Sequence, residues 1–210
     1  MRKADIATVV RIALVPLIVY AVTLKLNPII PVTVFIVALV LDGVDGFLAL
    51  NETSKRRIGI STYIRYALGD DSAGALIKEY KPKVAEEASW GPRMDVAGDR
   101  IVEYSLWALF VYVKVIPFFV LLLIIAMHSL ADALMGSKGT STKAKTRFAE
   151  MVYTSKWSRL VANVLKALAF SYLMLVYIAG WNLYVGYALA GALVVFIMIR
   201  GAAEICESVA

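Results

Sequence analysis

The chain has one cysteine and one histidine among its 210 residues. The single cysteine, Cys206, excludes an internal disulfide, and the single histidine, His128, argues against a histidine-rich zinc site. Charged residues make up only 18% of the chain, whereas apolar residues make up 60% and the mean hydropathy is +0.74. Because a soluble domain is closer to half apolar, this composition indicates an integral membrane protein.

The apolar residues gather in long runs. No A-x-A-like cleavage site closes the first run, so we expect it to be a retained transmembrane helix and not a signal peptide. A helix needs about 20 apolar residues to cross the hydrocarbon core. The sequence therefore predicts an all-α membrane protein with a single domain over residues 1–210 and six transmembrane helices, at Ile6–Leu24, Pro31–Leu50, Val96–Val113, Pro117–Leu134, Leu160–Ala179 and Leu183–Arg200.

Lysine and arginine are distributed unevenly over the connections. Residues 51–94 and 135–159 are rich in both, whereas the short connections after the first, third and fifth segments hold one lysine or none. Short loops rich in lysine and arginine stay in the cytoplasm. We therefore expect both termini and both long connections on the cytoplasmic side. The net charge of +6 reflects this distribution, so we expect membrane lipids as partners and no nucleic acid.

The connection over residues 51–94 has a pattern of its own. Ile58–Leu68 mixes isoleucine, tyrosine and leucine with Arg65, and Ala73–Tyr80 is typical of a short helix that ends before Pro82. We interpret this stretch as a small cytoplasmic insertion that lies on the membrane surface. The alternative is a flexible, solvated loop.

Two pairs of aspartates flank this insertion. Asp42 and Asp45 end the second predicted span, and Asp95 and Asp99 begin the third. A charged side chain at the centre of a membrane helix costs about 3 kcal/mol, so four carboxylates near the membrane need a reason. Spacings of three and four residues place each pair on one face of its helix. In the predicted topology, both pairs converge just below the cytoplasmic surface.

Four clustered carboxylates repel one another unless a cation lies among them. Ligands that are all oxygen favour Mg²⁺, Mn²⁺ or Ca²⁺ over zinc, and Mg²⁺ is often shared between carboxylates and substrate phosphates. A substrate that bears a pyrophosphate therefore suits this site. The glycines at 43, 46, 91 and 98 leave room for a flat base or a phosphate, although small residues also serve helix packing in membranes.

This pattern resembles the CDP-alcohol phosphotransferase family, also called the CDP-alcohol phosphatidyltransferases. The family motif is D-x-x-D-G-x-x-A-R, a spacer, and G-x-x-x-D-x-x-x-D. The positions that match this motif are Asp42, Asp45, Gly46, Ala49, Gly91, Asp95 and Asp99. Two features depart from it. Leu50 stands where the family has arginine, and the spacer, which is short in the family, covers residues 51–90 in this sequence.

The resemblance implies a reaction and a role for each motif residue. An alcohol would attack the lipid-bearing phosphorus of a CDP-linked lipid and release CMP. The resemblance also implies two bound ions of Mg²⁺ or Mn²⁺ and a homodimeric enzyme. Asp99 would be the general base. The metal ligands would be Asp42, Asp45, Asp95 and Asp99, and the CDP-binding residues would be Asp42, Gly46, Ala49, Gly91 and Asp95.

A second basic cluster follows the fourth predicted span. The resemblance implies that Lys143, Arg147 and Arg159 hold an anionic acceptor such as a phosphorylated polyol. The alternative is ordinary positive-inside charge in contact with lipid headgroups. Arg11, near the start of the first span, is expected to extend to the inner interface.

Three other functions remain open at this point. An aspartate-rich membrane prenyltransferase would need a second aspartate motif, but Asp132 is the only aspartate after Asp99. A cation transporter also uses acidic residues in its spans, yet no predicted span has a carboxylate-lined outer half. A catalytically degenerate scaffold is favoured by Leu50 alone.

Overall fold

The computed structural model describes residues 3–54, 56–80, 90–137, 152 and 156–209. Within these residues it contains eight helices and no strand, which confirms the all-α prediction. The chain divides into two compact units, Met1–Leu106 and Trp107–Ala210. The predicted single domain over residues 1–210 stays a prediction.

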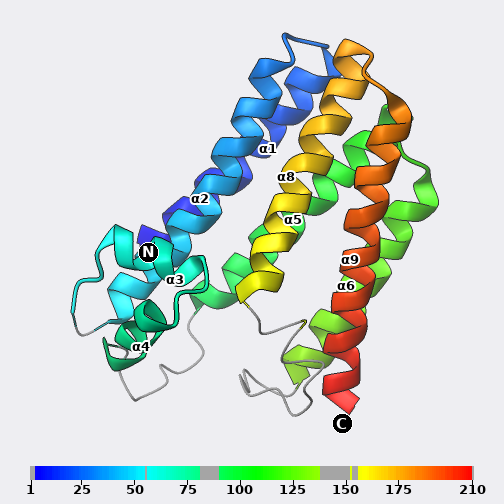
Figure 1. The fold of residues 1–210 in the computed structure, drawn as a ribbon. Helices are drawn as coiled ribbons and strands as arrows, with labels where there is room; N and C mark the ends of the chain where they lie inside the picture. The colour runs from blue at the N-terminus through cyan, green and yellow to red at the C-terminus, as the bar shows by residue number, and fades with distance from the viewer. Residues whose placement is uncertain (1–2, 55, 81–89, 138–151, 153–155, 210) are drawn as a thin grey trace. The chain divides into compact units, whose positions relative to one another are not determined.

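The first unit begins with two helices that run side by side in opposite directions, α1 (Lys3–Thr23) and α2 (Ile29–Thr53) (Figure 1). The turn between them is tight: Lys25 has a φ of 50°, and the Leu26 amide donates to the Ala21 carbonyl at 3.0 Å. Apolar side chains of both helices, such as Ile18 and Phe35, are fully buried. Between membrane helices, van der Waals packing of such side chains stabilises the pair.

The predicted insertion contains two short helices, α3 (Ile60–Ala67) and α4 (Asp71–Tyr80), so the short helix expected at 73–80 is confirmed. Asp70 is the N-cap of α4, because its Oδ1 accepts from the Ser72 and Ala73 amides at 2.8 and 3.2 Å. The hydrogen bond from the Ser72 side chain and the Arg65 guanidinium hold the pKa of Asp70 well below its ordinary value. The two helices are thus joined by a cap and an ion pair.

Helix α5 (Trp90–Tyr112) starts in the first unit and ends in the second, which also holds α6 (Phe118–Ser137), α8 (Lys156–Ala179) and α9 (Leu183–Val209). Aromatic packing forms the core of this second unit. The rings of Trp107 and Phe170 meet edge to face at 5.1 Å, and Phe110 lies 5.8 Å from the same phenylalanine. Such pairs add to the stabilisation from burial alone.

Among the residues that the structure describes, four helices are long and apolar enough to cross a membrane: α1, α2, α8 and α9. Four of the six predicted spans therefore have the length and composition of a span, which is compatible with an integral membrane protein. Helix α5 carries Asp99, Arg100 and Glu103 in the predicted segment, and the apolar stretch described for α6, Phe118–Leu134, is shorter. Crossing by α5 and α6 stays a prediction.

Candidate active site

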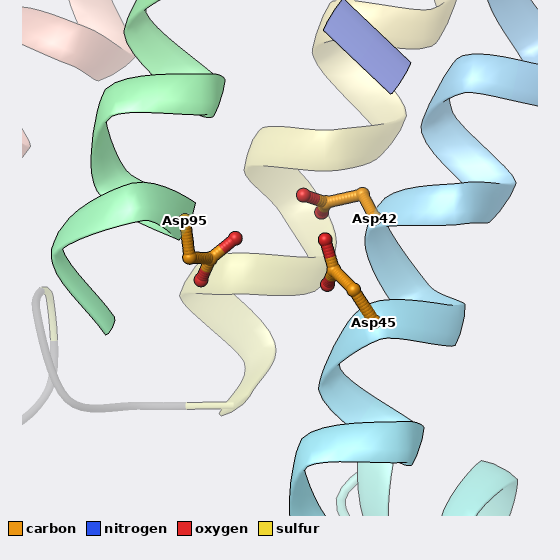
Figure 2. A group of neighbouring side chains, drawn as sticks. All are labelled: Asp42, Asp45 and Asp95. Carbon is orange, nitrogen blue, oxygen red and sulfur yellow. The ribbon is translucent and has the colours of Figure 1, made fainter. Parts of the chain in front are cut away.

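The structure brings three of the four aspartates together from two helices. Asp42 and Asp45 extend from α2 toward Asp95 on α5 (Figure 2). One oxygen of each carboxylate lies within 4.8 Å of the others. Asp99 lies one turn further along α5 and is not part of this three-carboxylate group. We refer to all four as the aspartate cluster.

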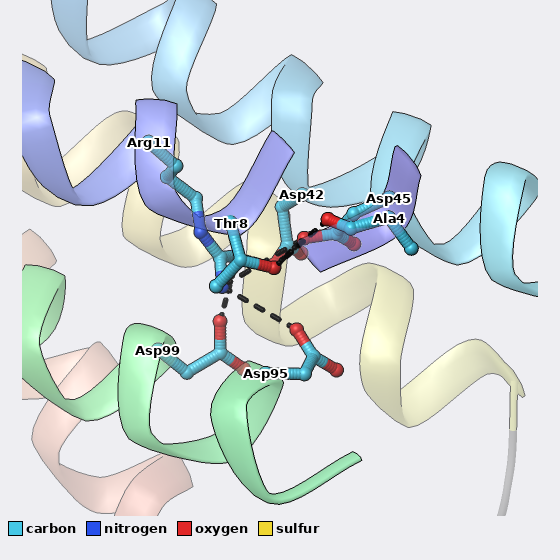
Figure 3. A network of polar contacts seen from close by, with 7 residues as sticks. All are labelled: Ala4, Thr8, Arg11, Asp42, Asp45, Asp95 and Asp99. Carbon is cyan, nitrogen blue, oxygen red and sulfur yellow. Dashed lines mark hydrogen bonds and ion pairs between the residues drawn. The ribbon is translucent and has the colours of Figure 1, made fainter. Parts of the chain in front are cut away.

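The guanidinium of Arg11 reaches all four carboxylates (Figure 3). Its Nη1 pairs with Asp42 and lies 2.8 Å from Asp99 Oδ1. Its Nη2 lies 3.4 Å from Asp95 Oδ1 and 4.0 Å from Asp45 Oδ2. The side chain is only 3% exposed and is therefore buried against the carboxylates; its expected extension to the inner interface stays a prediction. Four carboxylates provide nearby counter-charge, which compensates the burial of the guanidinium.

Thr8 contacts the cluster from the same face of α1. Its hydroxyl lies 3.1 Å from Asp45 Oδ2, to which it donates, and 3.3 Å from the Ala4 carbonyl oxygen. Sequence reasoning missed both Thr8 and Arg11. The signal was present, because Arg11 is the sole charged residue of the segment 6–24 and follows Thr8 by three positions.

The cluster is closed on one side and open on the other. The Asp45 side chain is 6% exposed and that of Asp42 is 26% exposed, whereas those of Asp95 and Asp99 are 52% and 43% exposed. A substrate can therefore approach the carboxylates of α5 more easily than those of α2.

Gly98 serves helix packing, which is the alternative that the sequence left open. A Cβ at this position would lie 2.6 Å from Thr8 Cγ2 and 3.0 Å from Arg11 Nη2. The missing side chain thus lets α5 approach α1 closely enough for Arg11 to contact Asp95 and Asp99. Gly43, in contrast, has open space at its Cβ position.

The donor set fits a hard divalent cation. Three carboxylate oxygens lie close together, and oxygen donors suit Mg²⁺ or Mn²⁺. Arg11 offsets only one of the four carboxylate charges, so the cluster keeps a strong negative field when its members are ionised. That field favours binding of further positive charge.

The remaining predicted site residues have different places. Gly46 and Ala49 continue α2 beyond Asp45, and Gly91 lies in the first turn of α5. Arg159 is exposed on α8 in the second unit. Lys143 and Arg147 lie outside the described residues.

The comparison with known families bears on the first half of the aspartate motif. The family model of CDP-alcohol phosphatidyltransferase matches residues 1–60. The predicted resemblance is thus confirmed over that segment. The match includes the residues of α1 that contact the cluster and the aspartates of α2, and it ends where α3 begins. It indicates a transferase that moves a phosphatidyl group from a CDP-alcohol. No curated protein and no solved structure matches the chain.

Proposed function

We propose that this protein is a divalent-metal-dependent membrane enzyme of phospholipid synthesis. It transfers the phosphatidyl-type group, a diradylglycerol phosphate, from a CDP-linked lipid to an alcohol and releases CMP. The observation that carries this proposal is the close approach of Asp42, Asp45 and Asp95 across two helices. The family match over residues 1–60, which includes Asp42 and Asp45, supports phosphatidyl transfer as the reaction.

Each aspartate has a proposed role. Asp42, Asp45 and Asp95 hold Mg²⁺ or Mn²⁺, and Asp99 completes a site for two ions. When bound, the ions offset the charge of the pyrophosphate and stabilise the departing CMP. The small residues Gly46, Ala49 and Gly91 border the cytidine, with Asp42 and Asp95 beside the diphosphate.

Asp99 is the proposed general base. Its carboxylate is 43% exposed, so an acceptor hydroxyl can approach it, and Arg11 Nη1 at 2.8 Å orients it. The hydroxyl oxygen attacks the phosphorus that bears the lipid and forms a new P–O bond. The hydroxyl proton passes to Asp99. The bond between this phosphorus and the oxygen bridging it to CMP breaks, and CMP leaves with that oxygen and its electron pair.

The proposed setting is a membrane protein with six spans and both termini in the cytoplasm. Helices α5 and α6 cross the membrane as the third and fourth spans. The aspartate cluster then faces the cytoplasm, and the insertion of α3 and α4 lies on the same side. The family resemblance is the basis for proposing a homodimer.

The proposed acceptor is a phosphorylated polyol held by Lys143, Arg147 and Arg159. Its test compares a neutral polyol with its monophosphate. We expect Arg147→Ala and Arg159→Ala to raise the KM for the monophosphate with little change in kcat. The reason is that the two native arginines would bind the acceptor phosphate equally in the ground state and in the transition state. Equal KM values for the wild type and both variants would contradict this assignment.

CMP release from CDP-diacylglycerol tests the reaction itself. The full chain is purified in detergent and assayed with Mg²⁺ or Mn²⁺ against serine, glycerol 3-phosphate, inositol and inositol 1-phosphate. We expect metal-dependent release with one acceptor, abolished in Asp99→Asn and retained in Asp71→Asn. The control residue, Asp71, is exposed on α4.

The same preparation separates the alternatives. A cation transporter would bind metal without binding CDP-diacylglycerol. A degenerate scaffold would show no turnover with any acceptor. Absence of CDP-diacylglycerol binding would contradict the proposed enzyme, whereas binding without turnover would indicate an acceptor outside the four tested.

A further inference from the structure

Helix α3 of the insertion touches α2 at the residue next to the aspartate cluster. A Cβ at Gly46 would lie 2.8 Å from the hydroxyl oxygen of Tyr63 and 3.9 Å from its Cζ. Outside α2 itself, these are the only atoms within 4 Å among the described residues. The absence of a side chain at Gly46 therefore admits the tip of the Tyr63 ring, one residue away from Asp45.

The position of the Tyr63 ring is fixed by its neighbours. The ring of Phe47 lies 5.2 Å away at an interplanar angle of 59°, and that of Tyr66 lies 6.5 Å away. Tilted aromatic pairs of this kind are favourable. The ring is half-buried, so part of its surface stays available for a ligand.

Two hydrogen bonds fix the start of the insertion to the end of α2. The Ile58 amide donates to Asn51 Oδ1 at 2.7 Å, and Asn51 Nδ2 donates to the Ile58 carbonyl at 3.3 Å. The Ile58 side chain is itself 4% exposed. Because α3 begins two residues later, this double contact determines where Tyr63 meets α2.

We propose that Tyr63 forms an aromatic wall of the nucleotide site and stacks on the pyrimidine ring of the CDP-linked lipid. This inference rests on the proposed function, in which Gly46 borders the cytidine. A base is recognised by stacking on an aromatic ring, and a ring that is already held in place loses little entropy on binding. The insertion is then part of substrate binding, and α3 supplies a contact that the short family spacer has no residues to make.

Binding of CDP to the full chain in detergent with Mn²⁺ tests this inference by calorimetry. We expect Tyr63→Leu to weaken CDP binding roughly tenfold, since stacking on one base is worth that order of affinity. Tyr63→Phe keeps the ring and is expected to bind within about twofold of the wild type. Tyr184→Leu, at an exposed tyrosine of α9 in the second unit, is the matched control and is also expected to stay within about twofold.

Fluorescence supplies a second readout that does not depend on the stability of Tyr63→Leu. In Tyr63→Trp, the new indole lies where the base is expected to stack. We expect CDP to quench its fluorescence beyond any change in the wild type or in Tyr184→Trp, whose indole lies on α9 in the second unit. Absence of this extra quenching would overturn the inference.

The outcomes separate this inference from the proposed function. If the wild type binds CDP and Tyr63→Leu binds as tightly or more tightly, Tyr63 is a spacer or an obstruction, and only the inference on Tyr63 fails. If the wild type does not bind CDP in the presence of Mn²⁺, the proposed function fails, and the inference fails with it.

Discussion

Arg11 joins the aspartates of α2 to those of α5. Its Nη1 pairs with Asp42 on one helix and with Asp99 on the other, and the side chain is 3% exposed. A buried guanidinium is expensive unless it is paired. Here it acts as a permanent positive charge that holds the carboxylates together before any metal binds.

Replacing Arg11 tests this role at the residue scale. Arg11→Gln leaves the carboxylates without their counter-charge, so we expect a loss of about 3–5 kcal/mol of stability in EDTA. Added Mn²⁺ replaces the missing positive charge. The rise in Tm on adding Mn²⁺ is therefore expected to be larger in Arg11→Gln than in the wild type, measured by thermal unfolding in detergent.

Arg200→Gln provides the control for this experiment. Arg200 Nε lies 3.2 Å from Glu204 Oε1 on α9, in the second unit. Its loss removes an ion pair and leaves the aspartate cluster intact, so the effect of Mn²⁺ should equal that in the wild type. An equal effect of Mn²⁺ in Arg11→Gln would show that Arg11 does not compensate the cluster.

At the scale of the helices, Gly98 determines how closely α5 approaches α1. The Cβ of Gly98→Ala would lie 2.6 Å from Thr8 Cγ2. We expect the variant to lower the free energy of unfolding by about 1–3 kcal/mol, as overpacking does. We also expect slower CMP release, because the added methyl group pushes α5 away from α1 and so moves Asp95 and Asp99 away from Arg11. Thermal unfolding and the release assay measure the two effects.

Gly191→Ala is the matched control, since Gly191 lies inside α9 and has open space at its Cβ position. Alanine favours a helix over glycine by about 1 kcal/mol. The control is therefore expected to leave Tm unchanged or to raise it. If Gly98→Ala behaved in the same way, the close packing of α1 and α5 would be refuted.

The contact between α2 and α3 makes a separate prediction at this scale. Gly46→Ala would place its Cβ 2.8 Å from the Tyr63 hydroxyl, and Tyr63→Phe removes that hydroxyl. We expect Gly46→Ala to lower Tm and the double variant to recover part of the loss. Additive effects of the two substitutions on Tm would mean that the two residues do not interact.

At the scale of the whole molecule, the location of the connection between α5 and α6 distinguishes six membrane spans from four. It holds Lys114, whereas the connection between α1 and α2 holds Lys25. In the six-span topology both lie outside the cell. If α5 and α6 do not cross, Lys25 stays outside and Lys114 lies inside.

Single-cysteine labelling measures this difference. Cys206 is free and exposed, so it is first replaced in Cys206→Ser. A membrane-impermeant maleimide is then applied to right-side-out vesicles that carry Lys25→Cys, Lys114→Cys or Lys78→Cys. We expect labelling of the first two without detergent and of the third only after permeabilisation. If Lys25→Cys were labelled without detergent but Lys114→Cys only after permeabilisation, the protein would have four spans and not six.

The sequence by itself determined the helical class, the four helices that have the length and composition of a span (α1, α2, α8 and α9), and the short helix predicted at 73–80, which the structure has at Asp71–Tyr80. These features depend on apolar run length and on residues three or four positions apart, and both are local. The same local rule placed Asp42 with Asp45 and Asp95 with Asp99. The two halves of the family motif could be read because the residues within each half are also near neighbours along the chain.

The tertiary structure alone decided which side chains meet across helices. Arg11 contacts Asp95 and Asp99, Thr8 packs on Gly98, and Tyr63 reaches Gly46. The partners of Arg11 and Thr8 on α5 are distant along the chain, and a single apolar run does not specify which of its faces turns toward another helix. Burial of Arg11 is stable only because four carboxylates converge on it, and that convergence exists only after the helices have packed.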